Sequence, residues 1–167
     1  MDGLLSTMTV DTLQEYGLRD MDAEAIQNFL RNQGVGVLGL PTEGAPYLIP
    51  LAFGYDGEDR LYFTYFVADE SRKATLSEDV DAASFLVYRA DSMFSWESVV
   101  MSGTLSEVPE AEWGDYADAL SNAWRLDIFE RADTAGRVRI FAFEIRDRTG
   151  IKYAELPPGF RDDSNDE

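Results

Sequence analysis

The chain has 167 residues, which suits one domain built around a single hydrophobic core. Its 32 acidic residues outnumber its 14 basic ones, and the net charge of −18 disfavours binding to nucleic acid or to an anionic membrane. The absence of cysteine and histidine excludes thiol nucleophiles, Ser-His-Asp triads and the usual zinc sites, so an enzyme of this composition is expected to take its reactive group from a cofactor.

The first predicted elements are an N-terminal arm and a short helix. Residues 1–21 show no clear period and are expected to form the arm. Over residues 22–33, the apolar Ile26, Phe29 and Leu30 recur at helical spacing. Asp22 is the expected N-cap of this helix, and Gly34 follows its end.

After Gly34 the hydrophobic period changes to two, which predicts antiparallel strands. Three consecutive strands are expected over residues 35–40, 47–55 and 60–67. Three more are expected over residues 82–89, 96–108 and 138–146, the last resuming near 151–153. Gly103 in the fifth strand predicts a bulge or bend.

Two further helices are predicted between these strands. A short one covers residues 71–78 with Ser71 as N-cap, and a long one runs from Pro109 to about Phe129. The second carries an aromatic stripe that is expected to pack in a core or an interface, formed by Trp113, Tyr116 and Trp124 together with Leu120.

These elements predict an α+β fold dominated by β-structure. The expected architecture is a closed or nearly closed six-stranded antiparallel split β-barrel with peripheral helices, covering residues 22–155. Residues 156–167 form an acidic tail that is expected to be disordered.

Aspartate is abundant and spread along the chain from Asp2 to Asp166, and lysine occurs only as Lys73 and Lys152. This pattern is typical of a halophilic protein, because a carboxylate surface keeps a protein hydrated where concentrated salt shortens the Debye length to about 3 Å. An acidic protein from an ordinary cytoplasm is the alternative. No stretch approaches the roughly 20 apolar residues of a membrane helix, and residues 1–6 lack a secretory start, so a cytoplasmic location is expected.

The segment most informative about chemistry joins the third strand to the short helix. Ser71, Arg72 and Lys73 stand at the start of that helix, where backbone N–H groups and two cations favour an anion such as a phosphate monoester. Charge-assisted hydrogen bonds would hold the phosphate against the long-range repulsion of the chain. The alternative for three such residues alone is a helix cap with two solvated cations.

The order of several short motifs resembles the pyridoxamine 5′-phosphate oxidase-related family, the FMN-binding split barrels. The resemblance covers roughly residues 22–153. Its motifs are Gly34-Val35-Gly36-Val37-Leu38, Pro46-Tyr47-Leu48-Ile49-Pro50, Leu61-Tyr62-Phe63-Thr64, Ser71-Arg72-Lys73 and Val99-Val100-Met101-Ser102-Gly103.

The resemblance implies a homodimer that binds FMN in two symmetric clefts at the subunit interface. Cofactor-binding positions implied for the phosphate are Thr64, Ser71, Arg72 and Lys73, with Phe63 beside them in the same motif. Ile49, Pro50 and Leu51 match the strand whose backbone faces the isoalloxazine ring, and Ser98 falls near a polar position of the family.

The C-terminal sequence departs from authentic pyridoxamine phosphate oxidases, which continue into a segment containing arginine and tryptophan. No tryptophan follows Trp124 here, so oxidation of vitamin B6 is not expected. Three hypotheses follow: an FMN-dependent oxidoreductase with a small-molecule electron donor or acceptor, a flavin-storing or flavin-sensing module, and a split barrel that uses the deazaflavin F420. The first is favoured, and no residue stands out as a catalytic acid or base.

Overall fold

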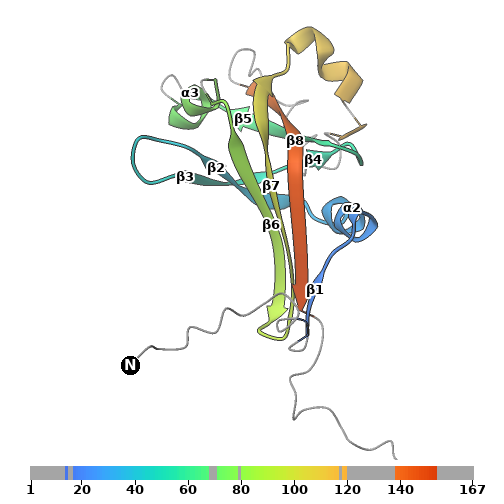
Figure 1. Ribbon diagram of the computed structural model, residues 1–167. Coiled ribbons are helices and arrows are strands. Elements are labelled where there is room, and N and C mark those ends of the chain that lie inside the picture. The colour runs from blue at the N-terminus through green and yellow to red at the C-terminus, as the bar shows by residue number, and fades with distance from the viewer. Residues whose placement is uncertain are drawn as a thin grey trace, which may run out of the picture.

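The computed structural model describes residues 14, 17–67, 71–78, 80–116, 118–119 and 138–153. Within them, antiparallel strands dominate and helices are few and short (Figure 1). The elements are β1 (Leu18–Asp20), α2 (Ala23–Arg31), β2 (Val35–Leu40), β3 (Tyr47–Ala52), β4 (Gly54–Tyr55), β5 (Arg60–Phe66), α3 (Arg72–Glu78), β6 (Ala83–Ser92), β7 (Ser95–Glu107), a 3₁₀ helix (Glu110–Tyr116) and β8 (Val138–Tyr153).

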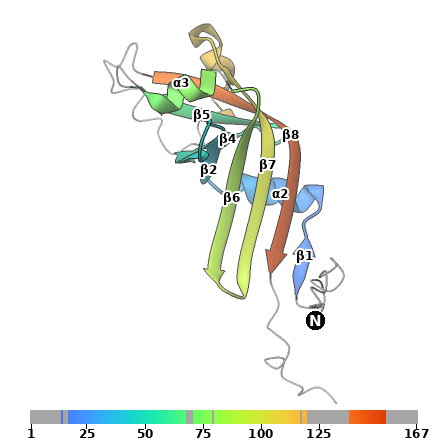
Figure 2. The same ribbon diagram turned by 60° about the vertical axis from the view of Figure 1, so that its left-hand side comes forward.

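The strands form one eight-stranded sheet in the order β3-β2-β6-β7-β8-β5-β4, with β1 paired to the end of β8. The two edge strands, β3 and β4, are consecutive in the chain and are separated by Phe53 alone. One continuous segment therefore pairs with β2 through its first half and with β5 through its second half. This connection requires the sheet to curl round on itself, as the two views show (Figures 1 and 2).

The antiparallel, mainly β architecture predicted from the sequence is confirmed, but the structure has eight strands where six were predicted. One additional strand arises because the predicted strand over residues 47–55 divides at Phe53, which leaves the sheet and enters the core. The other is β1, which belongs to the predicted arm. Most of that arm, like the predicted tail 156–167, lies outside the described residues.

Helix α2 forms where its sequence predicts. The Asp22 side chain caps the helix by accepting a hydrogen bond from the backbone N–H of Ala25 at 2.8 Å. The buried side of the helix presents Ile26, Phe29 and Leu30 to the sheet. Gly150 of β8 makes this approach close, because a Cβ at that position would come within 2.9 Å of the Ile26 side chain. In the described part of the chain, no helix has the length and apolar composition to span a bilayer.

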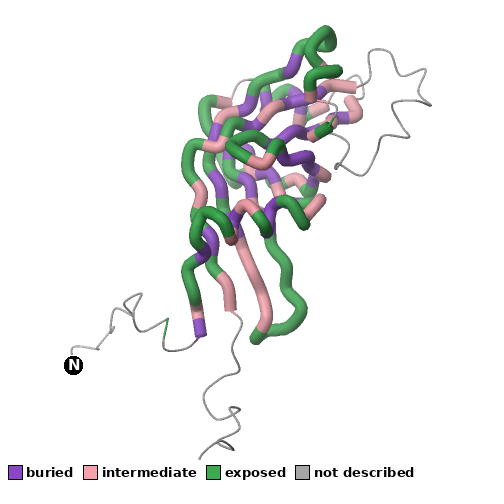
Figure 3. Tube along the Cα trace, turned by 90° about the vertical axis from the view of Figure 1, so that its right-hand side faces the viewer, coloured by how far each residue is buried: buried purple, intermediate pink, exposed green. Residues whose placement is uncertain are grey.

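The core inside the curled sheet is built largely from aromatic rings. Phe85 lies at its centre, with ring centroids 5.4 Å from Phe53 and 4.9 Å from Phe63. Phe143 of β8 completes this group, and all four rings are almost fully buried. Figure 3 shows the buried residues concentrated in the body of the molecule, while the hairpin that joins β6 and β7 is intermediate or exposed.

The irregularity predicted at Gly103 is confirmed, but the extra residue of the bulge is Arg146 of β8, because Ser102 pairs with Asp147 and Gly103 with Ile145. The register between β7 and β8 shifts between Ser102 and Gly103. A Cβ at Gly103 would overlap the backbone carbonyl oxygen of Glu144 on β8, so the two strands can approach here only because residue 103 has no side chain. The bulge therefore sets the curvature of the most extensive strand pair in the sheet.

The predicted helix over residues 109–129 differs from the structure at its start, where residues Glu110–Tyr116 form a 3₁₀ helix. Trp113 anchors this turn by donating its indole N–H to the carbonyl oxygen of Val108 at 3.0 Å. Tyr116 packs on Tyr62, with ring centroids 4.8 Å apart. Both residues thus pack as predicted, while Leu120 and Trp124 lie outside the described residues.

Candidate functional site

Helix α3 packs against β7 and contacts β3 and β5 through side chains, which brings the start of the predicted phosphate-binding segment to the sheet. Ala74 and Ser77 are its buried residues. The Ser77 hydroxyl donates to the Lys73 carbonyl oxygen at 2.7 Å, and the Tyr65 hydroxyl of β5 lies 2.9 Å from the Ser77 oxygen. Since the Ser77 proton is already used, Tyr65 is the donor to Ser77. This buried chain of hydrogen bonds fixes α3 against β5.

The two cations at the start of α3 each lie over a tyrosine ring. The Arg72 guanidinium carbon is 4.8 Å from the centroid of Tyr47 on β3. The Lys73 ammonium is 5.1 Å from the centroid of Tyr65 on β5. Cation–π contacts at these distances restrict two otherwise mobile side chains. The structure therefore gathers parts of β3, β5 and α3 around one pair of positive charges.

Arg72 differs from two other arginines in its partners. Arg89 binds Asp91 and Glu97, and Arg139 binds Glu78 and Glu107. Arg72 is exposed, and among the described residues it has no carboxylate partner. Its guanidinium donors are thus not used by an internal ion pair of the described chain.

The length of α3 changes the electrostatic argument made from the sequence. The helix has only seven residues, so its dipole supplies little attraction for an anion. Ser71 starts the helix through its carbonyl oxygen, which accepts from the backbone N–H of Thr75 at 3.1 Å. Any anion binding here depends on the side chains of Arg72 and Lys73 rather than on the helix end.

Strand β3 is an edge strand, and the three candidates on it point in alternating directions. Ile49 and Leu51 pack on or in the core, whereas Pro50 is exposed. The backbone N–H of Phe53 donates to the carbonyl oxygen of Gly34 on the β2 side. Hydrogen-bonded residues alternate along an antiparallel pair, so the backbone groups of residues 49 and 51 also bond to β2. Pro50 falls on the open side, where its missing N–H breaks no ladder bond. The open side of β3 thus offers backbone groups that the sheet does not use.

Phe63 and Thr64 lie on opposite faces of β5. The Phe63 side chain is fully buried among Phe85 and Phe143, which leaves only its backbone available for a ligand. Thr64 is half-buried on the other face and pairs with Ile140 of β8. The burial of Phe63 follows from the strict alternation of side chains along the strand.

Ser98 is not brought to the other candidates within one chain. It pairs with Ile151 near the end of β8, while Thr64 pairs with Ile140 near its beginning. These two β8 residues are eleven positions apart, which corresponds to about 35 Å along a strand. The other predicted positions lie on β3, β5 and the first turn of α3 or the residue before it.

Most side chains on the outward side of five strands are uncharged, and two exposed carboxylates lie at the rim of this area: Asp147, opposite Ser102 of β7, and Asp20 of β1, opposite Ile151 of β8. Residues on this side alternate with buried ones, and five of its large apolar side chains are exposed: Val35 60%, Leu48 66%, Tyr88 58%, Val100 49% and Ile151 43%. We call this surface the uncharged face. It comprises Val35, Val37 and Gly39 of β2, Leu48, Pro50 and Ala52 of β3, Ser84, Leu86, Tyr88 and Ala90 of β6, Trp96, Ser98, Val100 and Ser102 of β7, and Thr149, Ile151 and Tyr153 of β8.

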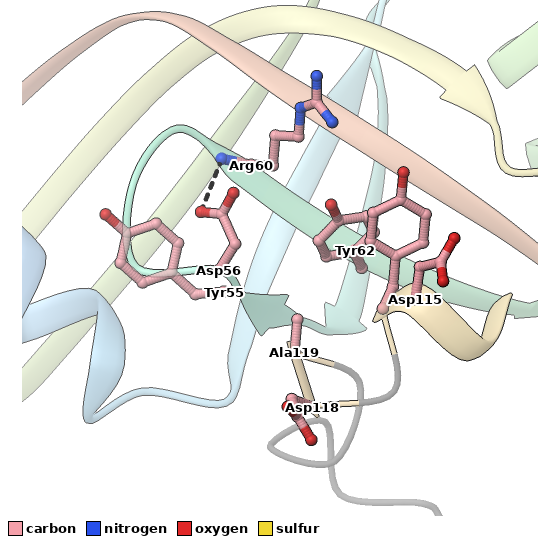
Figure 4. A pocket seen from close by; sticks show the side chains of 8 residues that line it. Tyr55, Asp56, Arg60, Tyr62, Asp115, Asp118 and Ala119 are labelled. Carbon is pink, nitrogen blue, oxygen red and sulfur yellow. Dashed lines mark hydrogen bonds between the residues drawn. The ribbon is translucent and has the colours of Figure 1, made fainter. Parts of the chain in front are cut away.

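A separate cleft of about 460 Å³ opens between β4, β5 and the residues following β7 (Figure 4). Its lining residues are Tyr55, Asp56, Arg60, Tyr62, Asp115, Tyr116, Asp118 and Ala119. None of the predicted cofactor-binding residues lines it. Asp56 uses one carboxylate oxygen to accept from the backbone N–H groups of Glu58 and Arg60, so part of the polar lining serves the turn itself.

The buried Tyr65 hydroxyl gives the stability of the protein a specific pH dependence. Burial raises the pKa of Tyr65 from 10.0 to about 12. Because the folded-state pKa exceeds the unfolded-state value, the contribution of the neutral hydroxyl is complete below pH 10 and is lost as the pH rises to about 12.

We expect the wild-type free energy of unfolding to fall by on the order of 2 kcal/mol more than that of Tyr65→Phe between pH 9 and pH 12. Urea unfolding of both proteins at fixed salt measures this difference. The other tyrosines titrate in both proteins and cancel. Parallel pH profiles for the two proteins would contradict the assignment.

Comparison with known protein families identifies the family of this chain. The family model for pyridoxamine 5′-phosphate oxidase matches residues 22–152. The chain belongs to the pyridoxamine 5′-phosphate oxidase family. No curated protein is significantly similar to it in sequence. The resemblance seen in the sequence motifs is thereby confirmed, and the matched range contains every candidate residue of this pyridoxamine 5′-phosphate oxidase family member.

Solved structures share the fold of this family member at low sequence identity. An FAD-binding protein from Mesorhizobium loti has a TM-score of 0.67 at 22% identity, covering 82% of this chain and 99% of its own. The FAD and haem binding protein from Mycobacterium smegmatis has a TM-score of 0.64 at 20% identity, with coverages of 85% and 75%. The flavocytochrome Anf3 from Azotobacter vinelandii has a TM-score of 0.64 at 17% identity, with coverages of 89% and 73%.

Proposed function

We propose that this protein binds FMN and acts as a flavin-dependent oxidoreductase, in a homodimer whose second copy completes each cofactor site. The observation that carries the proposal is the pair of cations at the start of α3, which lie over tyrosine rings of β3 and β5 in a member of the pyridoxamine 5′-phosphate oxidase family. Similar folds in proteins named for FAD binding support a flavin as the cofactor class.

The residues at α3 suit a phosphate monoester. Arg72 can donate two parallel hydrogen bonds to phosphate oxygens while its plane stays on the Tyr47 ring. Lys73 adds a second charge from the same turn, and Ser71 and Thr64 supply hydroxyl groups on either side of the β5–α3 connection. Contact of this kind offsets the repulsion expected between an anion and a chain of charge −18.

The open side of β3 suits the polar edge of an isoalloxazine ring. Backbone groups of residues 48, 50 and 52 face away from β2, and Pro50 contributes an acceptor without a competing donor. A bound flavin would supply the capacity to accept and return a hydride or single electrons. The chain's own part is to bind and orient the ring against this strand.

The uncharged face supports assembly with a second copy. Charged residues make up 28% of the chain, so a surface of this extent with so few of them needs a reason. Two copies of a strongly acidic chain repel each other least when they meet through surfaces that carry few charges. A two-fold symmetric dimer uses the same surface on both copies. Ser98 lies on this face, so it would reach a flavin only on the partner chain.

We expect the full-length chain, purified in high salt, to be yellow, to release FMN identified by mass spectrometry, and to have the molar mass of a dimer by light scattering. Reduction by NADH or NADPH under anaerobic conditions should bleach the colour. Colour without bleaching by any donor would favour a storage or sensing module, while released FAD or F420 would correct the cofactor. A colourless protein that takes up no flavin would overturn the proposal.

A further inference from the structure

The contact between Arg72 and Tyr47 joins two elements that are far apart in the sequence. Tyr47 is the first residue of β3, and Arg72 is the first residue of α3. The guanidinium carbon stands 4.8 Å from the ring centroid. Tyr47 is half-buried and packs against the core, so its ring has a defined position. An arginine stacked on such a ring loses much of its rotational freedom before any ligand arrives.

The partners of the arginines make this contact informative. Arg139 forms two hydrogen bonds with Glu107 and a further ion pair with Glu78. Arg72, in the same acidic chain, stacks on an aromatic ring and has no carboxylate partner among the described residues. An aromatic ring orients a guanidinium through its face and leaves the N–H donors at its edge unused. Arg139 shows this arrangement in use, because its guanidinium lies 5.1 Å from the Phe141 centroid and still binds Glu107 and Glu78 through its edge. The edge donors of Arg72 are in the same way available to a ligand with acceptor oxygens.

Lys73 also lies over a tyrosine ring, and that ring is more deeply buried. Its ammonium lies 5.1 Å from the centroid of Tyr65, whose own hydroxyl is held by Ser77 inside the core. Two rings from two strands thus support two successive cations. Successive side chains on a helix point in different directions, so the helix by itself does not bring Arg72 and Lys73 together. The rings of Tyr47 and Tyr65 fix where each cation lies.

We propose that Tyr47 is a positioning residue for the phosphate of the cofactor, because its ring holds the Arg72 guanidinium in the orientation that binds phosphate oxygens. This inference rests on the proposed flavin-binding function and adds a specificity determinant to it. Tyr47 acts through Arg72, and its hydroxyl is not required. The ring therefore favours phosphorylated flavins over riboflavin, which has the same isoalloxazine ring and no phosphate.

The test compares the dissociation constants of FMN and riboflavin for the full-length protein at one fixed salt concentration. We expect Tyr47→Leu to weaken FMN about two- to fivefold, the range of an exposed cation–π contact, and to leave riboflavin unchanged. Tyr47→Phe keeps the ring and should retain the wild-type ratio of the two constants. In an Arg72→Ala background, Tyr47→Leu should have no further effect on that ratio.

Each remaining outcome has a distinct meaning. Equal weakening of FMN and riboflavin by Tyr47→Leu would show a structural role for Tyr47 and overturn the inference. A smaller preference of Tyr47→Phe for FMN over riboflavin would also overturn the inference. So would an undiminished effect of Tyr47→Leu in the Arg72→Ala background, because the ring would then not be acting through the guanidinium. A wild-type protein that binds neither flavin would instead refute the proposed function. Circular dichroism of each variant checks that the β-sheet is intact.

Discussion

Replacing Gly103 with alanine is expected to destabilise the protein by about 3 kcal/mol or more. The added Cβ would overlap the carbonyl oxygen of Glu144, which is backbone and cannot rotate away. The strands β7 and β8 would have to separate at the bulge, with loss of neighbouring ladder bonds. Urea unfolding at fixed high salt measures the free energy of unfolding of wild type and variant.

Gly39→Ala provides the matched control. Gly39 also lies in a strand, but an added Cβ there would find its nearest neighbour, a Leu48 side-chain atom, at 3.5 Å, which is ordinary contact. We expect this substitution to change the free energy of unfolding by less than about 1 kcal/mol. Similar effects of Gly103→Ala and Gly39→Ala would show that the bulge tolerates a side chain, and the proposed reason for its curvature would be wrong.

The double substitution Arg72→Ala with Lys73→Ala is expected to weaken FMN on the order of 100-fold, while riboflavin binds as it does to the wild-type protein. Each charge-assisted hydrogen bond to phosphate contributes roughly 1.5–3 kcal/mol, and salt screening of these exposed groups favours the lower end. Quenching of flavin fluorescence on titration measures both dissociation constants. Retained FMN affinity in this variant would remove the phosphate assignment.

The control for this variant must change the net charge equally. Arg146→Ala with Lys152→Ala removes two positive charges from β8, away from the candidate site on α3. We expect it to weaken FMN by less than about threefold, because long-range attraction is small where the Debye length is a few ångströms. An equal loss in both double variants would mean that total charge, and not contact at α3, governs binding.

Much of the secondary structure was predictable because its signals are local. The spacing of Ile26, Phe29 and Leu30 and the Asp22 cap predict α2 with the observed capping bond. Alternation along β5 places Phe63 and Tyr65 inside. Gly103 predicts the bulge because a strand needs a residue without a side chain where its partner's backbone approaches closely. Alternation did not reveal that the segment over residues 47–55 serves both edges of the sheet.

The candidate site was predictable only in part. The motif of Ser71, Arg72 and Lys73 marks two cations, but nothing local indicates which residues face them. Tyr47 precedes Arg72 by 25 positions, and before the fold is known its ring could as readily belong to the core or the rim. The pattern of apolar residues also misleads at Phe63, where a residue inside a ligand-binding motif is committed to the core.

The sequence by itself determined which residues alternate, where the chain turns, and that the protein is strongly acidic with two cations beside one strand end. Only the tertiary structure decided that rings from β3 and β5 hold those cations and that five strands present one uncharged face. The reason is physical. Side-chain direction follows from the backbone geometry of neighbouring residues, whereas the meeting of distant residues depends on how the sheet curls and pairs.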